Sequence, residues 1–444
     1  MLRLARWFAL ALLLPGLAAA QTAPQPPAQK WAAVWAGSAH GPYPSGNPTA
    51  QPEMKFAFPS ADTGASDQSF RMIVRPDLWG PRFRLRFSNA FGTKPVTFDG
   101  VHMGVQAAAG ALVRGTNRPV TFNGKREITL EPGKMAYSDP VGLDFIGKTP
   151  DAALSGRKLA ISFHVAGTSG KMTWHAKALQ TSYLSAPGAG SHGVEDSDAS
   201  FPYSTTSWYF LDAVELMVPA DTTVVVAFGD SITDGTASTL NGDDRYPDVL
   251  SRRLHAIYGT RVVVVNAGIG GNQVAGPAKY TVDEPSAGGP SAGDRLERDV
   301  LSLGGVTHVL WMEGINDLAR NTGGAPPVIE GFKAGVARLR AKQIRVIGGT
   351  LTTALGSTST AHGSPEVDKE RRAINDYIRA AGSFDGVADF DAATLDPATG
   401  GLKAEYQPNS TTGGPGDKLH PNRAGYQAMA TTVDVGLFSA ARKK

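Results

Sequence analysis

The sequence predicts two domains: an antiparallel β-sandwich or jelly-roll-like domain, then an α/β domain with a parallel sheet covered by helices on both sides. Between about residues 31 and 219, apolar residues alternate with polar ones between turn residues, and no long helical pattern interrupts them. From residue 220 to 444, wholly apolar strands alternate with helical spacing, which is typical of parallel sheets. A chain of 444 residues is also long enough for more than one core.

The first 20 residues have the pattern of a secretory signal peptide. Arg3 and Arg6 precede a short apolar run, and the small residues Ala18 to Ala20 end it. The run is too short to span a membrane comfortably, so we expect cleavage, and no later segment approaches a spanning helix in length. Residues 21–30, rich in Pro, Gln and Ala, are expected to be a flexible leader. The protein is therefore expected to be exported, periplasmic or extracellular, with no integral membrane segment after cleavage.

Charge and cysteine content argue against some classes of partner and chemistry. The formal net charge is +3, and two of these charges lie in the expected signal peptide. The mature chain is then nearly neutral, which gives no support to a nucleic-acid partner. With no cysteine in the chain, neither disulfides nor thiol chemistry contributes. The oligomeric state stays open.

The clearest strand of the first domain is "RFRLRFS", residues 82–88. Phe83, Leu85 and Phe87 alternate with three arginines, which predicts a strand with one face buried and one in water. The domain is also rich in aromatic residues, which serve either as core or as a sugar-stacking platform. These residues are Trp31, Trp35, Trp79, Trp174, Trp208 and Tyr209.

The second domain is expected to contain five buried strands, at residues 224–228, 262–265, 306–312, 344–351 and 387–390. Helices are expected at residues 246–258, 296–303, 331–342, 365–381 and 421–441. In such a sheet, the loops after the strands open at one edge, where residues distant in sequence converge.

Short polar motifs stand at four of these strand ends. They are "GDS" at 229–231, "NAGIGGN" at 266–272, "EGIND" at 313–317 and "DKLHPN" at 417–422. Together they supply the parts of an ester hydrolase. Ser231 needs a base to take its proton, and His420 is a candidate. Asp417 can hold that imidazole, while the Ser231 N–H, a glycine N–H and the Asn316 amide can stabilise an oxyanion.

Each motif alone is weak, because Gly, Asp, Ser and Asn are common in turns and caps. The four in order favour a serine hydrolase. Asp230, Asp234 and Asp317 are expected to brace loops, and we expect neither a metal nor a cofactor. The remaining histidines are interpreted as structural or surface residues: His40, His102, His164, His175, His192, His255, His308 and His362.

These motifs resemble the SGNH hydrolases, also called the GDSL esterase/lipase family, from about residue 221 to the C-terminus. The resemblance implies a five-stranded flavodoxin-like α/β/α sandwich. It also implies that Ser231 is the nucleophile, His420 the base and Asp417 its partner, with Ser231, Gly271 and Asn316 forming the oxyanion hole. Gly271 is chosen over Gly268 and Gly270 because it directly precedes Asn272. "EGIND", "DFDAATLDP" and the preceding β domain further resemble exported bacterial two-domain members, whose substrates are poorly assigned.

The sequence thus predicts an exported serine esterase acting on a small-molecule or polysaccharide ester. We expect acetyl or other short acyl groups, with a carbohydrate as the alcohol. One alternative is a lipase or lysophospholipase, although residues 271–294 are polar and rich in Gly and Pro rather than amphipathic. A second is a non-catalytic carbohydrate-binding or surface protein on a hydrolase fold. Acyl transfer through the same acyl-enzyme also stays open.

Overall fold

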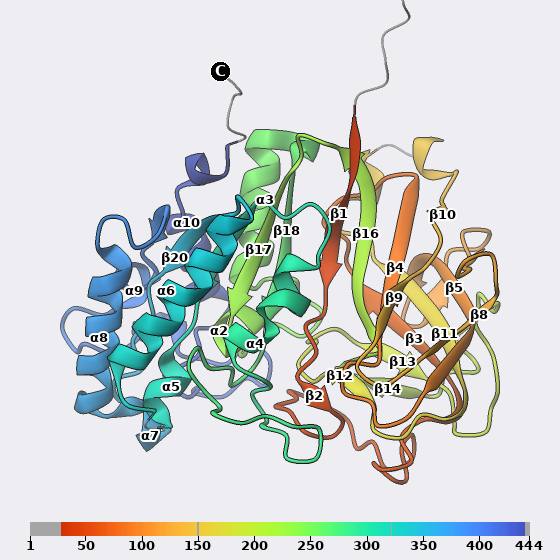
Figure 1. Cartoon of the computed structure of the whole chain (residues 1–444), viewed down its shortest axis with the longest axis horizontal. Coiled ribbons are helices and arrows are strands. Elements are labelled where there is room, and N and C mark those ends of the chain that lie inside the picture. The colour runs from red at the N-terminus through yellow and green to blue at the C-terminus, as the bar shows by residue number, and fades with distance from the viewer. Residues whose placement is uncertain (1–27, 149–150, 321, 440–444) are drawn as a thin grey trace, which may run out of the picture.

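The structure is a computed structural model that describes residues 28–148, 151–320 and 322–439. The expected signal peptide, residues 1–20, and most of the expected leader lie outside the described residues. Among the helices of the described ranges, none has the length and apolar character needed to cross a membrane. Figure 1 shows the two parts of the chain side by side, with the parallel sheet and its helices on the left and the antiparallel strands on the right.

The N-terminal part is built from two antiparallel sheets and a small third one. β1 (Gln29–Ala36) pairs with β16 (Leu211–Pro219), so that Gln29 lies opposite Pro219. The first sheet continues through β4 (Arg82–Ser88) to β10 (Val141–Gly142), with β9 (Met135–Tyr137) also on β4. The second contains β14 (Tyr203–Thr205), β13 (Ser182–Leu184), β3 (Ser66–Val74), β11 (Leu159–Thr168), β5 (Val96–Ala108) and β6 (Ala111–Leu112), with β7 (Arg118–Pro119) and β8 (Glu127–Leu130) on β5. The third contains β15 (Trp208–Tyr209), β12 (Thr173–His175) and β2 (Gly41–Pro42).

Aromatic rings fill the space between the two larger sheets. Phe87 of β4 packs edge-on against Phe163 of β11, with ring centroids 5.1 Å apart. Such pairs contribute beyond the area that they bury. Four of the six aromatic residues singled out above are also buried, namely Trp35, Trp174, Trp208 and Tyr209. They belong to the core and offer no ring face to a sugar.

β4 departs from the expectation in one respect. Phe83, Leu85 and Phe87 are buried as predicted, but the opposite face lies only partly in water, since exposure falls from Arg82 through Arg84 to the buried Arg86. The Arg86 side chain is 2% exposed and pairs with Asp212 at 2.7 Å. It also donates a hydrogen bond to Ser302 of the C-terminal part. The Arg86 end of this face is therefore covered by the second domain, a long-range contact that alternation along one strand does not reveal.

The C-terminal part has the predicted parallel sheet. Its strands are β17 (Thr223–Gly229), β18 (Val262–Gly268), β19 (His308–Met312), β20 (Arg345–Gly349) and β21 (Gly386–Ala388). They pair in the order β18-β17-β19-β20-β21, all parallel, which is the flavodoxin-like order. The predicted fold class is confirmed.

Helices cover both faces of this sheet because its strands are apolar on both. Val224 and Val226 pack toward α6 (Ala325–Ala341) and α8 (Pro365–Arg379). Val225 packs toward α3 (Tyr246–Tyr258) and α10 (Arg423–Thr432). Shorter helical segments lie in the connections: α2 (Ser231–Asp234), η2 (Gly259–Arg261), α4 (Ala292–Leu296), the π-helical η3 (Glu297–Leu301), α5 (Ile315–Ala319), α7 (Thr360–Gly363), α9 (Phe390–Thr394), η4 (Ala404–Tyr406) and η5 (Val435–Phe438), with η1 (Ile146–Lys148) and α1 (Asp151–Leu154) in the N-terminal part.

Several predicted helix boundaries are wrong. α6 begins at Ala325 rather than at residue 331, because two prolines occupy its first turn, where no backbone donor is needed. The closing helix begins at Arg423, with Asn422 capping its first N–H groups, and ends at Thr432. The β-branched residues that follow disfavour a helix, and a separate 3₁₀ turn continues the chain at Val435.

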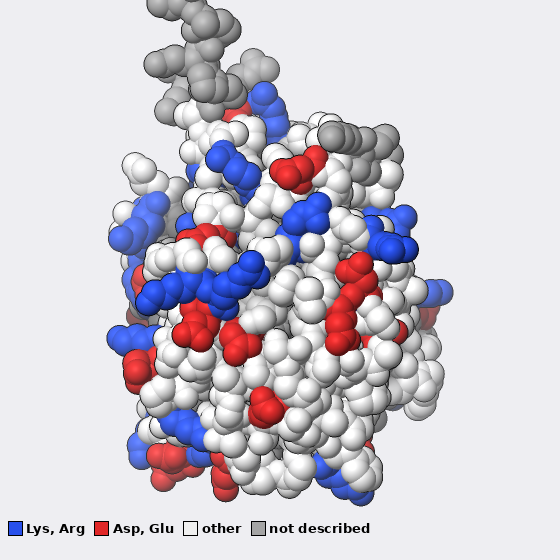
Figure 2. Space-filling view, turned by 90° about the vertical axis from the view of Figure 1, so that its right-hand side faces the viewer, with Lys and Arg blue, Asp and Glu red and all other residues white. Residues whose placement is uncertain are grey.

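The two parts meet along β18, an edge strand of the parallel sheet, which lies beside β1 (Figure 1). Asp77 of the N-terminal part accepts a hydrogen bond of 2.7 Å from the backbone N–H of Val264. Its carboxylate also binds the hydroxyl of Ser251 and, at 3.0 Å, Nε2 of His255. Asp77 thus blocks an edge that would otherwise be open to pairing with another chain. On the face of the N-terminal part that Figure 2 shows, acidic and basic side chains are interspersed rather than gathered by sign.

Replacing Asp77 with alanine is expected to loosen the contact between the two parts. The change leaves a strand N–H, a hydroxyl and an imidazole without their acceptor, and each such loss costs about 1–3 kcal/mol. The free energy of unfolding, measured by urea titration, should therefore fall by at least ~2 kcal/mol. The matched control is Asp62→Ala, at an exposed position of the same part. Equal stability of the two variants would contradict the assignment.

Candidate active site

Ser231 stands just after β17, the first strand of the parallel sheet along the chain. β17 ends at Gly229, Asp230 caps α2 by accepting a hydrogen bond from the Ile232 N–H, and Ser231 is the first helical residue. Gly229 is required here, since a Cβ would lie 2.2 Å from the carbonyl oxygen of Met312. The tight turn leaves the Ser231 side chain at the carboxyl edge of the sheet, where ligands bind in open α/β folds.

His420 and Asp417 lie beside Ser231, although 189 and 186 residues separate them from it in the sequence. The Ser231 Oγ is 2.7 Å from Nε2 of His420, and Nδ1 of the same ring is 2.5 Å from Oδ2 of Asp417. Asp417 also accepts hydrogen bonds from the backbone N–H groups of Leu419 and His420. The sequence-predicted catalytic residues are thus brought together in one hydrogen-bonded line.

The environment of Asp417 keeps it ionised. Burial opposes the charge, but the hydrogen bond and charge of His420, together with the backbone N–H groups, lower the pKa of Asp417 well below its usual range. An ionised carboxylate on Nδ1 makes that nitrogen the donor, so Nε2 faces Ser231 as a proton acceptor.

The three glycines after β18 differ in what their N–H groups do. The Gly268 N–H donates to the Asn266 side chain, and the Gly270 N–H donates to Oδ2 of Asp234 at 2.9 Å. Within the described residues, the Gly271 N–H has no acceptor. Gly271 also has a φ of +81°, which favours glycine. This pattern favours Gly271 as the free donor of the loop.

Asn316, on α5, joins this loop from the next strand end. Its Nδ2 donates to the carbonyl oxygen of Asn272 at 2.9 Å, and Asn316 itself is 7% exposed. The predicted amide donor therefore lies next to Gly271, and its second amide hydrogen stays available. A serine, an imidazole and N–H donors at neighbouring strand ends are the groups that acyl transfer requires.

Comparison with known proteins agrees with this geometry. Residues 227–428 match the model of the GDSL-like Lipase/Acylhydrolase family. This part of the chain is a GDSL-like lipase/acylhydrolase domain. Family membership supports an ester-hydrolysing enzyme. No curated protein matches the chain.

Several solved structures are similar to about half of the chain at low identity. A GDSL-like lipase from Bacteroides thetaiotaomicron is 19% identical, covering 50% of this chain and 91% of its own, with a TM-score of 0.35. A member of the lipolytic protein G-D-S-L family from Veillonella parvula is 17% identical (48% and 96% covered, TM-score 0.32). A carbohydrate acetylesterase family member from Sinorhizobium meliloti is also 17% identical (48% and 95%, TM-score 0.34).

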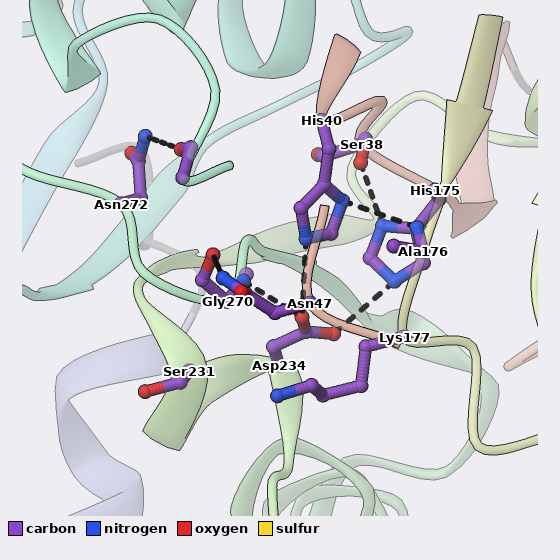
Figure 3. A network of polar contacts seen from close by, with 12 residues as sticks. Ser38, His40, Asn47, His175, Ala176, Lys177, Ser231, Asp234, Gly270 and Asn272 are labelled. Carbon is purple, nitrogen blue, oxygen red and sulfur yellow. Dashed lines mark hydrogen bonds and ion pairs between the residues drawn. The ribbon is translucent and has the colours of Figure 1, made fainter. Parts of the chain in front are cut away.

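The N-terminal domain reaches the GDSL site through a buried polar network, drawn in Figure 3. His175 Nε2 lies 3.1 Å and His40 Nε2 4.0 Å from the Asp234 carboxylate, which in turn holds the Gly270 N–H. Lys177 is buried and donates to the Thr236 hydroxyl at 2.6 Å. Asn47 donates to the Gly270 carbonyl oxygen at 2.9 Å.

Charges in this network compensate one another. Burial opposes ionisation of Asp234, but His175, His40 and Lys177 together lower its pKa. Burial also lowers the pKa of His40 well below its usual value and lowers that of Lys177. In the described ranges, no three His, Asp or Glu side chains are grouped so as to hold a metal ion. The network instead anchors the turn after Ser231 and the Gly270 loop to the N-terminal domain.

Sequence reasoning missed several residues that lie at this site. His40 and His175 were expected to be structural or surface residues, and they are buried beneath the Gly270 loop. His362 was also expected to be a structural or surface residue, and its Nε2 lies 3.2 Å from Oδ1 of Asn316. No sequence pattern pointed to Lys177 or Asn47. None of these residues belongs to a motif. The packing of the two domains brings His40, His175, Lys177 and Asn47 to the GDSL site, whereas His362 comes from α7 of the GDSL domain itself.

Behind Ser231 lie three buried carboxyl groups. Burial raises the pKa of Asp230 to about 8, of Glu313 to about 7 and of Asp317 to about 6. Asp317 braces the loop after β18, as expected of a loop residue, by accepting from the N–H groups of Val274 and Ala275. These groups sit too close together to ionise independently.

The Asp230→Asn variant should change how stability depends on pH. The unfolded carboxyl has a pKa of about 3.9, whereas burial raises the folded value to about 8. Between these values the folded state holds a proton that the unfolded chain has lost, so the wild type loses stability as pH rises through this window. Asparagine keeps the cap without the charge. The stability of the variant relative to wild type should therefore grow from pH 4 to pH 8 by about 1.4 kcal/mol per pH unit at most, reaching a few kcal/mol.

Urea unfolding at several pH values measures this difference. Asp283→Asn, at a carboxyl whose side chain is 87% exposed, is the control and should give no trend with pH. A constant difference between Asp230→Asn and wild type across the window would show that Asp230 is ionised in the folded state.

Proposed function

We propose that the protein is an exported serine esterase that hydrolyses carboxylic esters through an acyl-enzyme. The observation that carries the proposal is the line from Ser231 through His420 to Asp417, with distances of 2.7 and 2.5 Å. A hydroxyl, a base and an orienting carboxylate at hydrogen-bond distance are the elements of nucleophilic catalysis at neutral pH. A non-catalytic protein has no need to keep all three aligned beside free N–H donors.

In the proposed reaction, His420 Nε2 takes the Ser231 proton while Oγ bonds to the ester carbonyl carbon. The carbonyl oxygen becomes an oxyanion, which the N–H groups of Ser231 and Gly271 and the Asn316 amide stabilise. His420 then gives its proton to the leaving alcohol as the ester C–O bond breaks. Water repeats the sequence on the acyl-enzyme: His420 takes one water proton, the acid leaves, and Ser231 regains its hydrogen. The chemistry requires no metal or cofactor.

The surroundings of Gly271 support a short acyl group and a polar alcohol such as a carbohydrate. A Cβ on Gly271 would lie 2.8 Å from Asn47 Nδ2 and 3.6 Å from Arg320 Nη2. Arg320 in turn approaches the Gln273 side chain. Polar side chains at this wall give a long alkyl chain little apolar surface to contact. A lipase or lysophospholipase is less well supported, because the described residues 271–290 contain no helix that could act as an amphipathic lid.

Ser231→Ala tests the mechanism directly. We expect purified mature protein, from Gln21 onward, to hydrolyse a short-chain aryl ester, and the variant to lose ~10⁴-fold or more in kcat. Thermal unfolding of the variant serves as the control for folding. Equal turnover by both proteins would mean that another group performs the reaction, and inactivity of both would favour a binding role.

Acyl-chain length tests the substrate class. With 4-nitrophenyl esters from acetate to decanoate, kcat/KM should be highest for acetate or the next short esters and fall as the chain grows. A channel for long chains would gain about 0.8 kcal/mol per buried methylene instead. A rate that still climbs beyond about eight carbons would replace this proposal with a lipase-type acylhydrolase.

A further inference from the structure

His362 lies behind the amide of Asn316, in a position that no motif assigns. It belongs to α7, a four-residue helix in the connection between β20 and α8. Its Nε2 is 3.2 Å from Oδ1 of Asn316, and its Nδ1 is 2.8 Å from the Ser359 Oγ. A continuous line of polar contacts therefore runs from Ser359 through His362 to Asn316.

The direction of each hydrogen bond in this line follows from its fixed end. The carbonyl oxygen of Asn272 is only an acceptor, so the group that faces it on Asn316 is the amide nitrogen. The amide oxygen then faces His362 and needs a donor, which requires the proton on Nε2. In the neutral ring, Nδ1 becomes an acceptor for the Ser359 hydroxyl. Burial, and then the charge of His420, lower the pKa of His362, which favours this neutral form.

We propose that His362 is a positioning residue for the oxyanion hole: its Nε2–H fixes and polarises the Asn316 amide, so that the free amide hydrogen points at the developing oxyanion. Without His362, the amide retains only the Asn272 contact and can rotate away. A donor on the carbonyl oxygen also draws electron density from the nitrogen, which strengthens its N–H as a donor by about 10–30% per bond in a chain. The inference rests on the proposed function, because it requires Asn316 to act on an ester oxyanion.

The proposal predicts where the kinetic effect appears. The oxyanion exists only in the transition state and intermediate, so loss of its support lowers kcat and leaves KM nearly unchanged. Removing a whole donor costs about 100- to 1000-fold. Removing its support should cost less, so we expect His362→Ala to lower kcat by about tenfold. His362→Gln should recover much of this, because its side-chain amide can also donate to Asn316 Oδ1.

A double-mutant cycle on a short aryl ester separates the possible roles of His362. If His362 acts through Asn316, then His362→Ala should have no further effect on kcat once Asn316 is alanine. An undiminished loss in the Asn316→Ala background would overturn the proposal in favour of direct substrate contact or a structural role. Thr360→Ala, at an exposed position of the same short helix, is the control and should keep wild-type kcat.

Histidine ¹⁵N chemical shifts of the full chain test the hydrogen-bond line without any substrate. We expect the neutral His362 ring to carry its proton on Nε2, and the reverse tautomer would overturn the proposal. Failure of the proposed function looks different: wild type and Ser231→Ala would then be equally inactive. Failure of the positioning role alone would leave an active wild type and an equally active His362→Ala.

Discussion

The arrangement of the catalytic edge depends on one buried guanidinium. Arg295, 1% exposed, donates to the carbonyl oxygens of Gly229 and Ala267 at 2.8 Å each, which are the ends of β17 and β18. It also binds the Asn272 side chain at 2.6 Å, pairs with Asp299 and lies 3.9 Å from the Phe228 ring. A planar five-donor group suits such a junction, since a lysine could not satisfy several acceptors in fixed directions. Removing it would take a donor away from two buried carbonyl groups and from the Asn272 side chain, and would leave Asp299 with Arg298 as its remaining cationic partner.

These contacts of Arg295 explain why the loops after β17 and β18 keep their mutual position. Asp234 also restrains the loop after β18, because it accepts a hydrogen bond from the Gly270 N–H. Asp234 itself is held by residues of the N-terminal domain, such as His175. The Gly270–Gly271 segment is thus fixed by a cation inside the GDSL domain and by a network that crosses the domain boundary. Preorganised donors need such rigidity, because donors that must reorient during the reaction stabilise the oxyanion less.

The sequence predicts the features that depend on neighbouring residues, such as strands and short motifs. It does not predict contacts between segments that are distant in the sequence. The five strands were predictable because each is a short apolar run, and the order of the four motifs at their ends was enough to place Ser231, His420 and Asp417 together. The burial of Arg86 was not predictable from the sequence, because the second domain covers the part of β4 where it lies. Arg295 lies in α4, which begins before the predicted helix. His362 had no signal, because its partner Asn316 comes from another strand end 46 residues away.

The pairing of β1 with β16 sets the order in which the chain can assemble. Because the first strand of the sandwich finds its partner in the last, that sheet closes only after residue 219 has been made. Contacts so distant in sequence form slowly, since a long loop must close before they are gained. The parallel sheet, whose edge strand lies against β1, follows in the chain, so every strand of the sheet that it packs against precedes it in synthesis.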